Sequence, residues 1–178
     1  MGLFDRLMGR DLPERRDGRR IYFRLLEQAR DPAFFGSGRF ADDYDGRIDL
    51  ISLHMAVMME RLRADGEDGK LLSQALFDEM KDDFEIALRE EGIGDTGVKK
   101  RIKPMINFFY ERAKAYTDAL NAESPQKAMA DVLMIEPDPD APTSFELRVA
   151  DYALEWLSSL RNLSMAQITQ ARFVFPEV

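Results

Sequence analysis

The stretch "GIGDTGVKKRIKPMINFFYERAKAYTDAL", residues 92–120, carries the strongest periodicity in this 178-residue chain. Its apolar side chains recur every three or four positions, which is the spacing of one face of an α-helix. They are Val98, Ile102, Met105, Phe109, Ala113, Tyr116 and Leu120. Pro104 lies inside this run and removes a backbone donor, so we expect a kink or break near residues 100–104. The stretch therefore predicts a long amphipathic helix.

The same helical spacing extends to both sides of this stretch. It predicts helices over residues 19–30, 47–64, 71–91, 125–135 and 143–162, with a short helix after Ser164. Asp45 is expected to cap the second of these helices, and "GEDGK" (66–70) is expected to be the turn that ends it. A loop over residues 33–46 holds four aromatic side chains, which we expect to be pinned to the core.

No segment shows the alternating pattern of a β-strand. The predicted fold class is therefore all-α, a single compact domain of about six to seven helices with no sheet. We place that domain at residues 18–178. Residues 1–17 are predicted to form a flexible or weakly amphipathic N-terminal segment, with a linker over residues 9–17.

Gly92, Gly94 and Gly97 match the G-x-G-x-x-G pattern of dinucleotide-binding loops. That pattern requires a strand before it within a βαβ unit, whereas a helix over residues 71–91 is predicted here. The plainer interpretation is that Gly92 ends one helix and that Asp95 or Thr96 caps the next. We therefore predict a turn between two helices in place of a nucleotide site.

Composition excludes several kinds of catalytic site. The chain has no cysteine and one histidine, His54, which rules out thiolate chemistry and the usual zinc sites. His54 lies in an apolar run and is expected to be a core histidine, and the carboxylates of residues 82–91 are expected to form a solvated face. We predict no catalytic residues, no cofactor and no metal, and hence a protein that is not an enzyme.

The net charge of −8 is unevenly spread. Residues 31–95 carry 17 acidic and 7 basic side chains, whereas residues 96–120 carry 6 basic and 2 acidic ones. The cations concentrate in the basic segment, which consists of Lys99, Lys100, Arg101 and Lys103. Two interpretations remain open: a solvated helix face, or a patch that meets an acidic partner, RNA or phospholipid headgroups. No specific DNA binding is expected from an acidic body.

No apolar stretch approaches the roughly 18–20 residues that span a bilayer. The start of the chain lacks the continuous apolar region of a secretory signal. We therefore expect a cytoplasmic protein, with peripheral contact at the cytoplasmic face of the inner membrane as a further option.

Four segments together resemble the ubiquinol–cytochrome c chaperone family. The denser two are "DGRIDLISLHMAVMMERL" (45–62) and "LSQALFDEMKDDFEIALREEGIGDTGVKKRIKPMINFFYERAKAYTDAL" (72–120). The others are "YFRLLEQARDPAFF" (22–35) and "FVFP" (173–176). The resemblance covers roughly residues 20–178.

That resemblance implies a helical assembly factor without catalysis. Mitochondrial relatives attend newly made cytochrome b as it enters the ubiquinol–cytochrome c reductase complex, together with a small partner protein and near the ribosomal exit tunnel. This chain lacks the transit peptide and the longer N-terminal region of those relatives, so it looks like the short bacterial form. The implied partner is cytochrome b or another subunit of the complex, with contact to the ribosome or the inner membrane as further options.

We hypothesise that two clusters frame the partner-binding surface. One is Asp45, Arg47 and Asp49, and the other is the basic segment. The first cluster has an equally good alternative interpretation, in which it only caps and pins a helix start. The alternative function is an all-α adaptor that binds RNA, the ribosome or a membrane surface through residues 99–103.

Overall fold

The computed structural model describes residues 12–135 and 144–178, and within them it contains seven α-helices and two short 3-10 helices. The α-helices are α2 (Pro13–Gln28), α3 (Tyr44–Leu62), α4 (Gly66–Glu90), α5 (Asp95–Leu120), α6 (Pro125–Val132), α7 (Phe145–Arg161) and α8 (Met165–Thr169). The 3-10 helices are η1 (Pro32–Phe34) and η2 (Arg63–Asp65). The described residues hold no strand, only an isolated bridge between Phe35 and Phe40. The predicted all-α class is confirmed.

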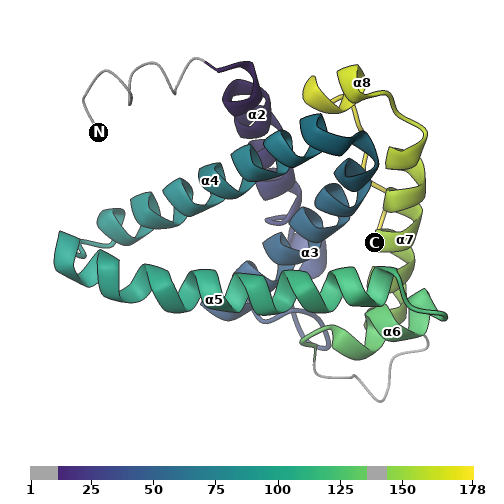
Figure 1. The fold of residues 1–178 in the computed structure, drawn as a ribbon. Coiled ribbons are helices and arrows are strands. Elements are labelled where there is room, and N and C mark those ends of the chain that lie inside the picture. The colour runs from purple at the N-terminus through teal and green to yellow at the C-terminus, as the bar shows by residue number, and fades with distance from the viewer. Residues whose placement is uncertain (1–11, 136–143) are drawn as a thin grey trace.

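Helix α3 lies at the centre of the molecule, and α2, α4, α5 and α7 all contact it (Figure 1). Most of its side chains are buried on every face, as expected for a helix enclosed by others. Helix α2 packs along α4, and α6 bridges α5 and α7. Of the four aromatic side chains expected to pin the loop to this core, Phe34 and Phe40 are fully buried and Phe35 is part-buried. Tyr44 is 43% exposed, so the prediction is wrong for this residue.

Helices α4 and α5 form a long hairpin whose turn projects away from the rest of the molecule, at the left of Figure 1. Gly92 has φ +81°, so it ends α4 in the left-handed conformation that was predicted. The amides of Gly92 and Ile93 donate to the carbonyls of Arg89 and Leu88, which completes a Schellman turn. A Cβ on Gly97 would meet Ile93 at 2.5 Å. The glycines therefore serve a helix-to-helix turn.

Two helix starts are capped by residues other than those predicted. The cap of α5 is Gly94, so the prediction of Asp95 or Thr96 was wrong. The prediction of Asp45 for α3 was also wrong, because Asp43 accepts from the Gly46 amide at 2.8 Å. Gly46 suits that position, since a Cβ there would overlap the Ala41 carbonyl oxygen at 2.1 Å.

The C-terminal helix starts follow the sequence more closely. Ser124 and Pro125 begin α6 as cap and first residue, and Ser164 with Gln167 forms a complete capping box for α8. Ser144 caps α7 by accepting from Leu147. Residue 143, where this helix was predicted to begin, lies outside the described residues.

Two helices begin earlier than their sequences suggest. Helix α2 starts at Pro13, although residues 9–17 were predicted as linker, because proline fits the first helical position. Gly18 lies in its interior, where a Cβ would meet Ala75 of α4 at 2.7 Å, so this glycine permits close helix packing. Helix α4 starts at Gly66, and the "GEDGK" segment is its first turn.

Of the kink or break expected near residues 100–104, the break is absent, because helix α5 continues without interruption through Pro104. Pro104 lies on the exposed side of the helix. The carbonyl that loses its intrahelical donor can therefore be hydrated.

Candidate partner-binding surface

A groove lies between the C-terminal half of α2, the N-terminal half of α3 and the C-terminal half of α4, and Met105 of α5 closes one side. We call it the α2–α3–α4 groove. It has a volume of about 370 Å³. Its apolar lining consists of Leu26, Ala29, Tyr44, Ile48, Ile51, Phe84, Ala87 and Met105. Its charged lining consists of Arg30, Asp43, Arg47, Asp83 and Glu91. The groove thus combines an apolar floor with a charged rim.

Tyr44 connects this groove to the basic segment. Its ring is 43% exposed, and its hydroxyl contacts the Met105 sulfur at 3.8 Å. The pKa of Tyr44 is raised by partial burial and by Glu91, while Arg101 acts in the opposite direction. Both charged groups therefore lie close enough to Tyr44 for their fields to act on it. Arg101 is also one helical turn from Met105, which places it at the edge of the groove.

The basic segment occupies the first turns of α5, close to the projecting end of the hairpin. All four of its side chains are exposed. Within the described residues none of the four makes an ion pair, in contrast to Lys81, Arg89 and Lys114, which do. This segment therefore presents uncompensated positive charge to the solvent.

Three residues of α3, namely Asp45, Arg47 and Asp49, were predicted to frame the partner surface. The structure places each of them in a different environment. Arg47 lines the groove and pairs with Asp42 at 2.8 Å. Asp45 is exposed in the first turn of α3 and does not line the groove. Asp49 is fully buried and lies inside the molecule. Of this cluster, Arg47 alone comes together with Arg101 at the groove.

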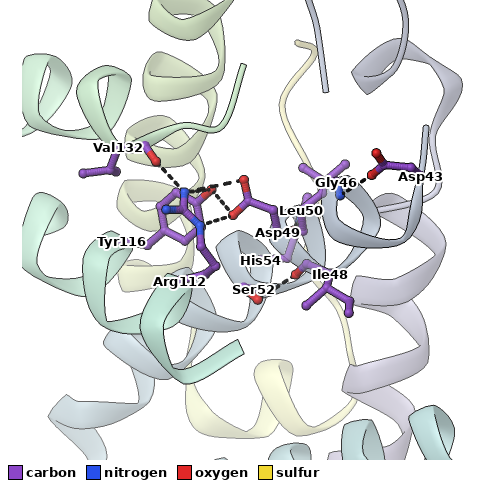
Figure 2. A network of polar contacts seen from close by, with 10 residues as sticks. All are labelled: Asp43, Gly46, Ile48, Asp49, Leu50, Ser52, His54, Arg112, Tyr116 and Val132. Atoms are coloured by element: carbon purple, nitrogen blue, oxygen red, sulfur yellow. Dashed lines mark hydrogen bonds and ion pairs between the residues drawn. The ribbon is translucent and has the colours of Figure 1, made fainter. Parts of the chain in front are cut away.

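Asp49 is the centre of a polar network between α3 and α5 (Figure 2). Its Oδ1 accepts from Arg112 Nε at 2.5 Å and from the Tyr116 hydroxyl at 2.6 Å. Arg112 also donates to the Val132 carbonyl, which ties α5 to the end of α6. Burial raises the pKa of Asp49, and the hydrogen bonds from Arg112 and Tyr116 oppose that rise. The network satisfies a buried carboxylate and has a structural role.

No single motif in the sequence identifies Arg112 as the partner of Asp49. Asp49 stands between Ile48 and Leu50 in a helix that is apolar on most sides, which indicates that its carboxylate needs a partner. Tyr116 belongs to the periodic stripe of α5, and Arg112 precedes it by one turn. A polar pair four residues apart on a buried face is a signal that could have identified the network.

His54 is a satisfied core histidine, as predicted. Its Nδ1 lies 2.8 Å from the Leu50 carbonyl oxygen, which can only accept, so Nδ1 carries the proton. Nε2 therefore accepts from the Tyr152 hydroxyl at 2.8 Å. Burial lowers the pKa of His54 to about 4, so the ring is neutral at pH 7.

A second groove lies where the end of α3 meets the first half of α4 and the second half of α5, with a volume of about 410 Å³. The rings of Phe77 and Tyr110 stack in its wall, with centroids 5.3 Å apart. Its charged residues are Glu60, Arg63 and Lys70, and each is in an ion pair. Unlike the first groove, it has no uncompensated charge in its lining.

Two kinds of feature are absent from the described ranges, 12–135 and 144–178. No helix there is both long enough and apolar enough to cross a membrane. No three histidine, cysteine, aspartate or glutamate side chains there gather so that they could hold a metal ion.

Comparison with known proteins agrees with the resemblance found in the sequence. The model of the family described as "Ubiquinol-cytochrome C chaperone" matches residues 38–175. The crystal structure of the Cbp3 homolog from Brucella abortus is similar, with a TM-score of 0.73 and 29% sequence identity. That match covers 98% of this chain and 95% of the Brucella chain. Among curated proteins, none matches this chain.

Proposed function

This chain belongs to the ubiquinol–cytochrome c chaperone family, and from that premise we propose that it is a non-catalytic assembly factor that binds newly made cytochrome b before its incorporation into the ubiquinol–cytochrome c reductase complex. Under this proposal the protein acts in the cytoplasm, at the cytoplasmic face of the inner membrane. Other subunits of the same complex are further candidate partners.

The observation that best supports this proposal is the position of the basic segment beside the α2–α3–α4 groove. A membrane protein that has not yet been assembled exposes apolar side chains together with polar connecting segments. A binding protein for such a client needs an apolar surface that adapts to several side chains, with charge close by. Met105 and Tyr44 supply the adaptable apolar surface, and Arg101 supplies charge at its edge.

Deletion of the gene tests the proposal. We expect cytochrome b and the ubiquinol–cytochrome c reductase complex to be depleted while other respiratory complexes persist, measured by spectra of the haem proteins and by native gels. Restoration by a plasmid-borne copy is the control. Normal levels of cytochrome b in the deletion strain would overturn the proposal.

A second function is favoured by the four exposed cations of the basic segment, which have no ion pair in the described part of the chain. It is an adaptor that binds RNA, the ribosome or a membrane surface through residues 99–103. Binding to phosphate groups releases counterions, so its affinity would fall steeply with salt. A dissociation constant for ribosomes or for anionic vesicles that does not change between low and physiological salt would exclude this alternative.

A further inference from the structure

We propose that the α2–α3–α4 groove holds an apolar segment of the partner that is followed by acidic residues, and that Arg101 and the neighbouring lysines of the basic segment contact those acidic residues. This inference deepens the proposed function and rests on it, because it assigns the face that binds the client and the chemistry of the bound segment.

The groove offers an apolar floor that the core leaves accessible. Its volume of about 370 Å³ lies within the range of sites that bind small molecules or side chains. Tyr44 is only part-buried, and the contact of its hydroxyl with the Met105 sulfur is a weak hydrogen bond. Both side chains can therefore move to accommodate an apolar side chain of a partner.

The cations beyond the groove favour an acidic extension of the occupant. The lining itself is not basic, because Arg30 and Arg47 stand against Asp43, Asp83 and Glu91, and Arg47 also pairs with Asp42. The basic segment lies outside the lining, and its four cations are exposed and make no ion pair within the described residues. An acidic part of the occupant is therefore favoured over α5 and not inside the groove.

The groove and the basic segment follow one another along the surface, and this order determines the order of apolar and acidic residues in the bound segment. Arg101 lies at the groove edge, one turn before Met105, and Lys99 and Lys100 continue along α5 towards the end of the hairpin. An occupant that places apolar side chains in the groove thus extends acidic side chains over α5. A polyanion such as RNA or a lipid surface would contact the cations and leave the apolar floor unused.

Two labelled model peptides test this inference with the full chain. Both have about 18 residues, the length of five helical turns, and in both a leucine-rich half is followed by a charged half. The charged half carries glutamate in one peptide and lysine in the other. Fluorescence anisotropy at physiological salt measures their dissociation constants. We expect the glutamate peptide to bind at least about tenfold more tightly than the lysine peptide.

Four variants locate the site. Ala87→Phe fills the groove from the part-buried side of α4, and Arg101→Glu reverses the charge at its edge. Each is expected to weaken binding of the glutamate peptide by at least about tenfold. Ala113→Phe fills the second groove, and Lys114→Glu reverses an exposed charge further along α5. These two controls are expected to change binding by less than about twofold. Circular dichroism melts verify that each variant is folded, and Arg101→Glu carries the test if Ala87→Phe does not fold.

Equal affinities for the two peptides would overturn the inference. It would also be overturned if the two control variants lost as much affinity for the glutamate peptide as Ala87→Phe and Arg101→Glu do. The inference would also be overturned if Arg101→Glu weakens binding of the glutamate peptide, Ala87→Phe does not, and poly(U) RNA or phosphatidylglycerol vesicles compete with the peptide. That result would indicate a surface that binds polyanions in general.

The deletion strain separates this inference from the proposed function. If the peptides are selected as expected while deletion of the gene leaves cytochrome b at normal levels, the inference about the groove stands and the proposed function fails. If deletion depletes cytochrome b while neither peptide is selected, the proposed function stands and the inference about the groove fails.

Discussion

Asp49 and the basic segment are both charged, and both were predicted to face a partner. The fold provides partners for the charge of Asp49 but not for the charges of the basic segment. Asp49 is fully buried and receives hydrogen bonds from Arg112 and Tyr116 (Figure 2). The four cations of the basic segment are exposed near the end of the α4–α5 hairpin and have no ion pair in the described residues.

The difference follows from the energy of removing a charge from water. A carboxylate that loses its hydration must recover hydrogen bonds inside the protein, so its partners are part of the fold. An exposed ammonium or guanidinium group keeps its hydration and costs the fold little, so it remains available for a partner. Buried charge in this molecule therefore contributes to the fold, whereas exposed uncompensated charge is available for the partner binding that we propose.

The largest expected effect comes from Asp49→Ala, which leaves the buried Arg112 and Tyr116 groups without their acceptor. We expect the free energy of unfolding to fall by about 3–5 kcal/mol, measured by urea unfolding. Asp45→Ala, an exposed carboxylate on the same helix, is the matched control and should change it by less than about 0.5 kcal/mol.

The double variant Asp49→Leu with Arg112→Met should be more stable than Asp49→Ala, because it removes both charges and leaves none unpaired. Similar losses in Asp49→Ala and Asp45→Ala would break the comparison between buried and exposed charge.

His54 extends the comparison to pH. Its pKa of about 4 in the folded protein lies below its ordinary value of 6.5, so between these values only the unfolded chain binds the proton. The contribution of neutral His54 to stability is thus complete above pH 6.5 and is lost as pH falls towards 4. The expected loss reaches about 3 kcal/mol.

Urea unfolding of the wild type and of His54→Gln at pH 7.5, 6.0 and 5.0 measures this effect. The difference in stability between the two proteins should shrink as the pH falls, because the carboxylates are common to both. A difference that stays constant over this range would show that His54 does not carry the pH dependence.

Gly92→Ala affects the turn that positions the basic segment. No atom lies within 4 Å of the added Cβ, so the cost arises from the backbone conformation at φ +81° alone. We expect a loss of about 1 kcal/mol in thermal or urea unfolding. Gly92→Asn is the conservative control, because asparagine tolerates the left-handed conformation better, and it should lose less than Gly92→Ala. Equal losses would point to a cause other than this conformation.

The smallest expected change in stability accompanies the reversal of Lys99, Lys100 and Arg101 to glutamate. Because these side chains are exposed and unpaired, the free energy of unfolding should change by less than about 1 kcal/mol. Under the proposed function, capture of cytochrome b should nevertheless weaken, measured by co-purification from cells.

A control with the same change in net charge reverses Lys70, Lys114 and Lys127, which are exposed elsewhere. Capture that is unaltered in the first variant, or equally weakened in the second, would remove the basic segment from the partner surface.

Local signals in the sequence determined the helical class, the turn at Gly92 and the core position of His54. These features depend on spacing and on the conformational preferences of single residues, which can be read over a few turns of chain. The same local rules failed where a distant contact decided the outcome. Gly18 stood between the predicted linker and the predicted helix over residues 19–30, but it lies inside α2 and allows that helix to approach Ala75 of α4. A kink or break was expected near Pro104, but the helix continues through this exposed position.

Tertiary structure alone decided which charges are partners and which remain free. Asp49 and Arg112 are 63 positions apart, and the apolar pattern of each helix indicates only which face is buried. It does not indicate which other helix covers that face. The α2–α3–α4 groove likewise exists only after four helices pack, since their side chains leave a space that no single segment encodes. Periodicity specifies the elements, and packing among distant elements specifies the surface.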